Sequence, residues 1–574
     1  MKKLILLLLV TYNLLASNYR LIPLSSHGVA LSSSNLAKSF NADAVFINPA
    51  NMTFLDKSQL HFSGNYYHIK GSHFTNQYDY GDFDFYGATD AKGEKYTVAL
   101  PTLAYMFKIT EDSRLGLALY SDFAALYGWS GDYAKSLAKN MDIRGGTLAL
   151  SFATKITPEL SFGASVTANH TRLKFSLEKD NAKSINYLNP PNSTNNKPTW
   201  VDNYGNTHNS YWAYNGDAKT RSDINYGYKL ALTYAPAKFD EKLRFSTVYN
   251  SQYMSKFYGT LDFNISKFEI TDFYFRMLGI GSNYMANEIN SALKAYGFDA
   301  FNDDFFNNIF GFNTSVAAVL LDVYNFDLNG DIISSLNSQD DKINFRGDLR
   351  TEFLYPASIN FGVAYEQGKH EFMVNIGRTF WNKFKKLKVD INAPEMPIKT
   401  IQLIQTTAGL CMQEISNGGG CENSGKLQEV IKQAMQAIDF NSTDKKEMQE
   451  YMLAALLNDA IEQKWKNTTL ISLGYRYNHD EKWSFMAGFA TEDSPVKREE
   501  ISFLAKDSRI YMYSLGTEYR YSENLTINLS GMYQKYADVK TDNSYHITSS
   551  FLPTIGEFKK QSNQIINLGF SYIF

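Results

Sequence analysis

Residues 509–536, RIYMYSLGTEYRYSENLTINLSGMYQKY, contain two alternating stretches joined by a short turn. From Arg509 to Tyr521 the odd-numbered positions are largely aromatic or apolar, and the even-numbered positions are small at first and then charged. A period of two residues predicts β-strands with one apolar and one polar face. The second stretch repeats the pattern, with Leu525, Ile527, Leu529 and Tyr533 alternating with Thr526, Asn528, Ser530 and Gln534.

Fourteen stretches of the chain alternate in this way. Their connections are short and long in turn, and the number is even, as is typical of bacterial outer-membrane barrels. The sequence therefore predicts an all-β fold, a transmembrane antiparallel β-barrel of 14 strands over residues 58–574, with an N-terminal plug and partly helical extracellular loops. The predicted strands are Gln59–Lys70, Tyr96–Ile109, Arg114–Tyr127, Ile143–Ile156, Leu160–Leu177, Ile224–Ala235, Leu243–Phe263, Tyr355–Glu366, His370–Val389, Thr468–Asn478, Trp483–Thr491, Arg509–Tyr521, Leu525–Val539 and Gln564–Phe574.

The composition agrees with a barrel. A net charge of −3 over 574 residues provides no basic surface for nucleic acid. The mean hydropathy of −0.33 resembles that of a soluble protein, but in a barrel the loops and lumen are polar and only alternate strand residues meet lipid. After the N-terminus, no segment reaches the ~20 apolar residues that a spanning helix needs.

The first residues have the organisation of a secretory signal. Lys2 and Lys3 precede an apolar run over Leu4–Val10, and Ala16 or Ser17 is a suitable cleavage residue. The alternative is a membrane anchor, but the run is too short to span a bilayer. We therefore expect residues 1–16 to be removed on export.

The next segment lacks both helical and strand periodicity. Residues 25–57, SSHGVALSSSNLAKSFNADAVFINPANMTFLDK, are rich in Ser, Ala and Asn and precede the whole barrel. This position predicts that residues 17–57 form a plug that the barrel encloses. Asn48-Pro49-Ala50 is a fixed point within it, because Pro restricts φ and the Asn side chain can bond the neighbouring backbone. Taken alone, Asn-Pro-Ala is simply a turn.

Three connections are long enough to fold: residues 180–222, 271–350 and 390–466. They can shield the barrel mouth, or they can form an apolar groove where an amphiphile first lands. Cys411 and Cys421 lie in the third, and in an oxidising compartment they are expected to form a local disulfide. Metal binding is the poorer alternative, since neither His nor further Cys is nearby.

Catalytic and metal motifs are missing from the sequence. It contains no Gly-x-Ser-x-Gly motif, and His27, His170 and His370 have no nucleophile signature beside them. Asp327–Asp331 has the first oxygen spacing of a calcium loop, but its Gly is at position 4 and position 12 is Ser338. We predict a protein that is not an enzyme and has neither cofactor nor metal. A barrel lipase would need a Ser–His pair at the lipid-facing rim.

Four motifs together resemble the FadL/TodX family of outer-membrane transporters for hydrophobic compounds. Asn48-Pro49-Ala50 resembles the family's hatch, and Ala99-Leu100-Pro101-Thr102 through Tyr127-Gly128 resembles its second and third strands. Phe380-Trp381-Asn382-Lys383-Phe384-Lys385-Lys386-Leu387 is similar to its Trp-x-x-Phe-x-x-Leu pattern in strand nine, and Glu492-Asp493-Ser494-Pro495-Val496 to its Asp-x-Ser-Pro-Val element. The order and spacing of the motifs carry the resemblance. The insertion at 390–466 is longer than expected for the family.

The resemblance implies passive uptake of long-chain fatty acids or similar hydrophobic compounds. Its steps would be a landing groove, an interior binding site, movement of the hatch and lateral release at a kinked third strand. Asn48, Pro49 and Ala50 would form the hatch. Arg172 and Lys388 would contact a ligand carboxylate, or else be surface charges near the membrane rim. The lateral gap would involve Ser121, Asp122, Ala124, Ala125 and Gly128, unless these residues form an ordinary strand end.

Two other functions are compatible with the same fold: uptake of aromatic hydrocarbons and transport of lipids. A protein of another class, a surface adhesin that displays its outer loops, is a further alternative. Expected partners are hydrophobic small molecules, outer-membrane lipid and lipopolysaccharide, and the barrel assembly machinery. The last of these follows from a closing strand that ends at the aromatic Phe574. We expect a monomer in the outer membrane of a Gram-negative bacterium.

Overall fold

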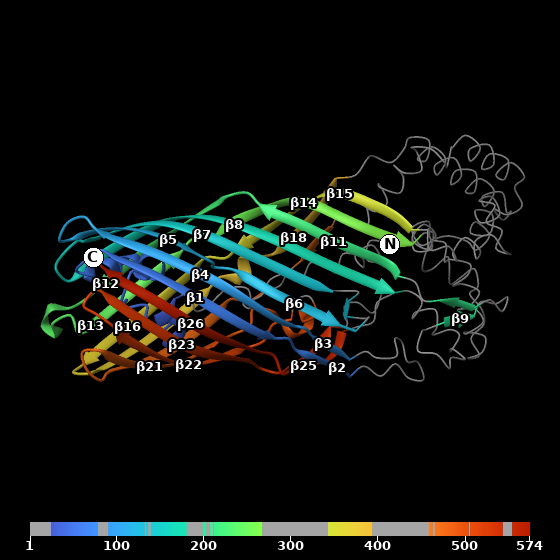
Figure 1. Ribbon diagram of the computed structural model, residues 1–574. Helices are drawn as coiled ribbons and strands as arrows, with labels where there is room; N and C mark the ends of the chain where they lie inside the picture. The colour runs from blue at the N-terminus through green and yellow to red at the C-terminus, as the bar shows by residue number, and fades with distance from the viewer. Residues whose placement is uncertain are drawn as a thin grey trace, which may run out of the picture.

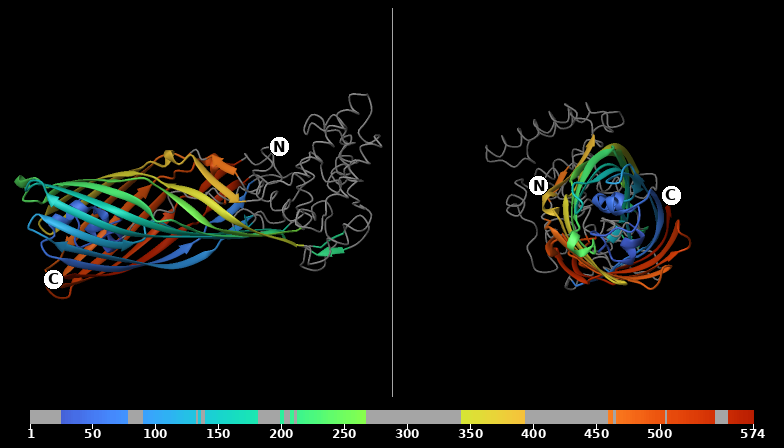
Figure 2. Two further views of the ribbon diagram at one scale, coloured as in Figure 1. Left: turned by 90° about the horizontal axis from the view of Figure 1, so that it is seen from above. Right: turned by 90° about the vertical axis from the view of Figure 1, so that its left-hand side faces the viewer.

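The computed structural model describes residues 25–77, 90–131, 134–135, 139–180, 199–201, 207–209, 212–266, 342–392, 459–462, 465–503, 506–543 and 554–574. They form a long, closed β-barrel with short helices inside it (Figure 1; Figure 2). The predicted antiparallel β-barrel of 14 strands is therefore confirmed. In the described part, none of the helices has the length and apolarity needed to cross a membrane.

The period-two pattern separates the two faces of the wall. In β22 (Ile510–Arg520), Tyr513 and Leu515 are 50% and 70% exposed, whereas Ser514 between them is 5% exposed. Tyr513 lies opposite Tyr533 of β23 (Leu525–Tyr536), so the aromatic faces of both strands coincide. Large apolar side chains thus cover the outer surface, where they meet lipid, and small polar side chains face the lumen.

Fourteen strands make the wall within the described residues, and several are bent or bulged once, so that one strand has two labels. Closure is direct, because β1 pairs along its whole length with β26 on one side and β4 on the other. In chain order the strands are β1 (Gln59–Lys70) with β2 (His73–Asn76), β3 (Ala91–Gly93) with β4 (Lys95–Lys108), β5 (Ser113–Tyr120) with β6 (Ala124–Ser130), β7 (Asn140–Lys155), β8 (Leu160–Asp180), β11 (Trp212–Ser222) with β12 (Asn225–Tyr234), β13 (Leu243–Asn250) with β14 (Tyr253–Ser266), β15 (Lys342–Tyr355) with β16 (Ser358–Gln367), β17 (His370–Thr379) with β18 (Lys386–Asn392), β19 (Asp459–Glu462) with β20 (Thr468–Asn478), β21 (Trp483–Glu492), β22, β23 with β24 (Val539–Asn543), and β25 (Thr554–Lys559) with β26 (Ser562–Ile573).

The predicted outer loops were wrong at their ends. Trp212–Ser222 is not loop but β11, which pairs with β8 and β14, and Lys342–Tyr355 is β15, which pairs with β14 and β18. At the ends of the third predicted loop, residues 390–392 belong to β18 and Asp459–Glu462 is β19, and these two strands pair with each other. The exposed face of β11 carries Asp217, Lys219 and Arg221, so the alternation of apolar residues is missing although the backbone ladder continues. A separate hairpin joins β9 (Thr199–Val201) and β10 (Thr207–Asn209).

Some of the predicted features lie outside the described residues. These are the signal segment 1–16, most of the loops 271–350 and 390–466, Cys411 and Cys421, and the Asp327–Asp331 motif with Ser338.

Residues 25–57, which we call the inner segment, lie within the ring of strands (Figure 2). The segment contains α2 (Ser26–Ala30), α3 (Ala44–Ile47) and the 3₁₀-helix η3 (Pro49–Phe54). Three further 3₁₀ turns lie elsewhere: η4 (Ala237–Phe239), η5 (Trp381–Lys383) and η7 (Arg498–Glu500). The small side chains of the inner segment let α2, α3 and η3 fit inside the barrel, and most of these side chains are fully buried.

Candidate functional site

The wall has glycine where the inner segment touches it. A Cβ atom added at any of seven wall glycines would lie within 3.0 Å of an atom of the inner segment. The seven are Gly116, Gly163, Gly362, Gly474, Gly488, Gly516 and Gly569. The inner segment therefore sits closer to the strands than any side chain on them would allow. At Gly163 the added atom would overlap the backbone of Pro49 and Ala50, which no rotamer change can relieve.

Asn48-Pro49-Ala50 is the corner of the inner segment against β8 and β12. The Asn48 Oδ1 atom accepts a hydrogen bond from the Ala50 N–H at 3.1 Å, so the predicted bond from this side chain to nearby backbone is confirmed. Its Nδ2 donates to the Leu36 carbonyl at 2.8 Å and to Thr233 Oγ1 at 3.2 Å. Pro49 begins η3, where its missing N–H costs nothing.

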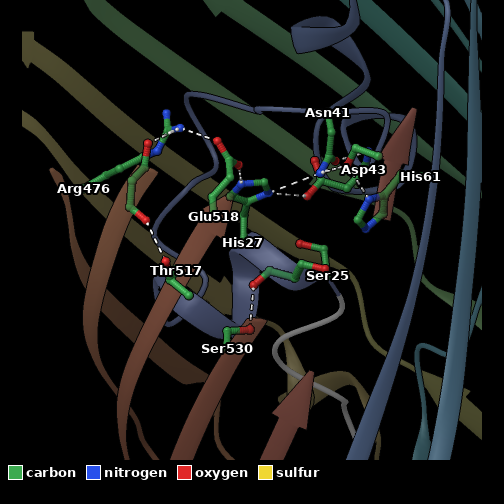
Figure 3. A network of polar contacts seen from close by, with 12 residues as sticks. Ser25, His27, Asn41, Asp43, His61, Arg476, Thr517, Glu518 and Ser530 are labelled. Carbon is green, nitrogen blue, oxygen red and sulfur yellow. Dashed lines mark hydrogen bonds and ion pairs between the residues drawn. The ribbon is translucent and has the colours of Figure 1, made fainter. Parts of the chain in front are cut away.

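On the opposite side the inner segment is held by charges, which we call the ionic anchor: His27, Lys38, Glu371, Arg476 and Glu518. The His27 Nε2 atom lies 2.8 Å from Glu518 Oε2, and Arg476 lies 2.7 Å from Glu518 and 3.1 Å from Glu371 (Figure 3). Lys38 Nζ is 2.9 Å from Glu371. Removing one partner would leave a buried charge unpaired, so this contact resists separation.

Asp43 lies beside the ionic anchor, completely buried, with one carboxylate oxygen 3.9 Å from His27 Nδ1. Burial disfavours its charged form and raises its pKa from 3.8 to about 6, while the nearby His27 acts in the opposite direction. At a pH between these two pKa values, the Asp43 carboxyl holds a proton when the inner segment is docked and has released it when the segment is undocked. Docking is therefore favoured at low pH, and this contribution is lost as the pH rises through about 6.

Replacing Asp43 with Asn is expected to remove this pH dependence, because the amide stays neutral throughout. The measurement is amide hydrogen exchange over residues 25–57 at about pH 5 and about pH 7.5, corrected for intrinsic rates. In the wild type, protection should fall as the pH rises, and in Asp43→Asn it should not. A variant that keeps the full pH dependence would contradict the assignment.

The wall is interrupted between β4 and the third strand, which consists of β5 and β6. At one end Leu103–Lys108 of β4 pair with β5, and at the other end Gly93 pairs with Trp129 of β6. Within residues 90–131, all of which the structure describes, no ladder joins the β4 residues between these points to β6. Five residues beyond the Leu103–Leu119 pair, the same register would set Val98 opposite Ala124.

The third strand also contains a bulge at the interruption. Tyr120 pairs with Thr147 of β7 and Ala124 pairs with Arg144, so three residues of one strand oppose two of the other. An extra residue bends the strand and increases its twist. Pro101 lies in the part of β4 that lacks this partner, and proline is found in strands chiefly at such edges.

A cavity of about 140 Å³ adjoins both the inner segment and the bulge of the third strand. Leu36, Phe46 and Ile47 of the inner segment line it, as do Asp122 and Phe123 of the bulge. Its other walls come from β8, β12, β13, β14, β16, β17, β20 and η5. One space therefore touches the inner segment and the wall interruption together.

Aromatic rings extend from this cavity across the lumen. Phe123 contacts Tyr355 of β15 with ring centroids 4.4 Å apart, and Tyr355 stacks on Tyr253 at 4.6 Å. Trp381 and Phe384, from the predicted strand-nine motif, are buried in the same group of rings and both contact Trp465. This motif therefore supplies a rigid apolar wall.

The predicted gap residues lie at the interruption. Ser121 and Asp122 occupy the bulge, Ala124 and Ala125 are buried at the start of β6, and the Gly128 carbonyl accepts a hydrogen bond from the Glu94 N–H at 2.9 Å. Asp122 also lines the cavity.

The predicted carboxylate contacts are not brought together at the cavity. Arg172 faces outward from β8, 46% exposed and 3.7 Å from Asp142, because its neighbours Thr171 and Leu173 face the lumen. Arg172 does not line the cavity in this arrangement, and a contact between Arg172 and a ligand carboxylate stays a prediction. Lys388 lies in β18 opposite Glu352 of β15.

The sequence analysis did not single out two kinds of residue: the wall glycines, and Lys229 of β12, which borders the cavity. The wall glycines could have been predicted, because glycine on the small-residue face of a strand indicates a close contact inside the barrel. Lys229 had no such signal, since its role depends on where the inner segment docks.

A family model described as outer membrane protein transport protein (OMPP1/FadL/TodX) matches residues 7–285 and 324–574. The long-chain fatty acid transport protein of Escherichia coli K12 is 26% identical over 138 residues, which cover 21% of this chain and 31% of that protein. Outer membrane protein P1 of Haemophilus influenzae is 34% identical over 85 residues, which cover 14% and 18%. The aligned parts thus span less than a third of these curated relatives.

Solved structures have the same fold. A Pseudomonas aeruginosa FadL homologue superposes with a TM-score of 0.58 at 15% identity, covering 97% of this chain and 100% of that one. The toluene transporter TodX of P. putida gives 0.52 at 13% identity, covering 95% and 98%. The family match over most of the sequence, on a closed barrel of 14 strands, shows that the chain belongs to the outer membrane protein transport family (OMPP1/FadL/TodX) and lies in the outer membrane of a Gram-negative bacterium.

Proposed function

We propose that the protein takes up long-chain fatty acids or similar hydrophobic compounds across the outer membrane without an energy source. The observation that carries this is the cavity of about 140 Å³ bounded by both the inner segment and the interrupted third strand. A barrel that only displayed loops would need neither a seated inner segment nor an opening in its wall. The family's transport character supports transport rather than catalysis.

The physical problem is the outer leaflet, whose charged lipopolysaccharide retards apolar solutes. A water-filled pore offers an apolar chain no hydrophobic gain along its path. Apolar sites arranged in series offer this gain, which is about 0.8 kcal/mol for each CH₂ group that is buried. The gradient then suffices to drive net uptake.

In the proposed route the ligand lands among the outer loops, enters the cavity, and leaves sideways between β4 and β6. The inner segment acts as the hatch. Ligand pockets usually measure about 300–1,000 Å³, so a cavity of about 140 Å³ is too small for a long chain until the inner segment moves. Lateral exit keeps the ligand out of water.

Aromatic hydrocarbons are the second candidate substrate. An apolar cavity of ~150 Å³ holds benzene in another protein, so a single ring fits the present space without movement. The ring-lined wall around Tyr253 and Tyr355 suits such a ligand. The toluene transporter among the structural relatives supports keeping this alternative.

The test combines uptake and binding. Cells lacking the protein should lose uptake of a labelled long-chain fatty acid and regain it with the full chain. Lipids extracted from the detergent-purified protein should include a specific amphiphile that Pro49→Ala or deletion of residues 25–50 alters. Competition by toluene would favour the aromatic alternative. Unchanged uptake and no bound amphiphile would instead favour a surface adhesin, tested by cell attachment.

A further inference from the structure

Lys229 projects from β12 into the lumen, where its Nζ atom donates a 2.6 Å hydrogen bond to the Phe46 carbonyl of α3. The same ammonium lies 5.4 Å from the centre of the Tyr120 ring, next to the bulge of the third strand. The side chain is half-buried and borders the cavity. One cation therefore touches the inner segment, the cavity and the edge of the wall interruption.

Among the described residues that line the cavity, Lys229 is the single basic one and Asp122 the single acidic one. Among the described lining residues, Lys229 is therefore the cationic partner for a long-chain carboxylate that enters this space. An ammonium carries three donors. A carboxylate brings a full negative charge to it, whereas the Phe46 carbonyl brings only a dipole, so the ion pair has the stronger Coulombic attraction. A ligand carboxylate therefore competes well with the neutral Phe46 carbonyl.

We propose that Lys229 is a specificity-determining residue that exchanges the Phe46 carbonyl for the carboxylate of an anionic amphiphile and thereby releases α3 from β12. This inference rests on the proposed uptake function. It differs from the sequence-based expectation, which assigned the carboxylate to Arg172 and Lys388.

The two sides of the inner segment differ in a way that supports this exchange. On β12 itself the other hydrogen bonds described are neutral, between Thr233 and the side chains of Asn48 and Asn51 at 3.2 and 2.8 Å. The nearby cation Arg244 of β13 has no acidic partner in the inner segment among the described contacts and stacks on the Phe54 ring instead, 4.2 Å from its centre. The opposite side is held by the ionic anchor, whose charges a ligand in the cavity does not reach in this arrangement. Release at Lys229 would therefore swing the α3 side away while the α2 side stays attached.

The test compares palmitate with hexadecanol, which has the same chain and no charge, on the full-length protein in detergent. The wild type should bind palmitate more tightly on the order of tenfold. Lys229→Gln should bind both equally, with hexadecanol affinity unchanged, and Lys229→Arg should keep the preference. Lys174→Gln, which removes an exposed lysine from the outer face of β8, should behave as the wild type.

A second readout uses the wild type alone, so it does not depend on the folding of any variant. Palmitate should increase hydrogen exchange over residues 44–47 and hexadecanol should not. Binding of both ligands with no preference, or a preference that survives in Lys229→Gln, would overturn the role of Lys229 but leave the uptake function standing. If the wild type binds neither ligand, both proposals fail.

Discussion

Gly163→Ala is expected to push Asn48-Pro49-Ala50 off the wall and to leave the inner segment partly undocked. The added Cβ would overlap the Ala50 nitrogen and the Pro49 carbonyl carbon, which are backbone atoms and cannot rotate away. Overpacking of this kind costs about 1–3 kcal/mol. One to two kcal/mol already changes the ratio of two states by a factor of roughly 5–30.

The measurement is amide hydrogen exchange over residues 44–55 together with influx of a large hydrophobic antibiotic. Both should rise severalfold in Gly163→Ala if the inner segment closes the lumen. Gly64→Ala on β1 is the matched control, because an added Cβ there meets nothing within 4 Å. Equal exchange in the two variants would show that the contact at Gly163 does not hold the segment in place.

Joining β4 to β6 across the interruption is expected to abolish uptake. A Val98→Cys/Ala124→Cys pair occupies the positions that the flanking register would set opposite each other. The ladders on either side hold the two strands in one register, and closing the interruption would bring these positions to the spacing of paired strands, about 4.7–4.9 Å. This is within the Cα separation of about 4.4–6.8 Å that a disulfide spans. The bridge would therefore hold the wall closed, and a reductant should restore uptake.

The control bridges the same β4 residue to its other neighbour. Val98→Cys/Tyr67→Cys joins residues that are already opposite in the continuous ladder of β1 and β4. It should leave uptake near the wild-type rate whether oxidised or reduced. An oxidised Val98–Ala124 pair that still imports the substrate would rule out lateral exit at this place.

The barrel itself was predictable because its cause is local. A strand between lipid and a polar lumen must alternate, so the pattern is written into each segment independently of the others. Thr468–Asn478 was predicted with the bounds that the structure has. The strands β11 and β15 were missed because their exposed faces are charged, with Asp217, Lys219 and Arg221 on β11 and Arg346, Asp348 and Arg350 on β15, so the apolar alternation of a lipid-facing strand is missing.

The site was predictable only in part. The Asn48 side chain bonds its own helix start, a short-range contact that the sequence shows directly. The third-strand residues were found through a family resemblance and a run of small side chains, whereas Pro101 on the facing strand is a physical sign of an edge that passed unused. Alternation along β8 sets Arg172 on the outward face that Val166 also occupies, 58% exposed, so its face could be predicted from the strand itself.

The architecture could therefore be predicted from the order of the residues: fourteen alternating strands, a small-residue segment before them, and the family. The tertiary structure alone decided which glycines seat the inner segment, where the ladder opens, and that Lys229 meets Phe46 across 183 positions of sequence. The physical reason is the range of the interactions. Alternation and capping act between neighbours in the chain, whereas close approach, ladder pairing and charge contacts in the lumen exist only after the barrel has closed.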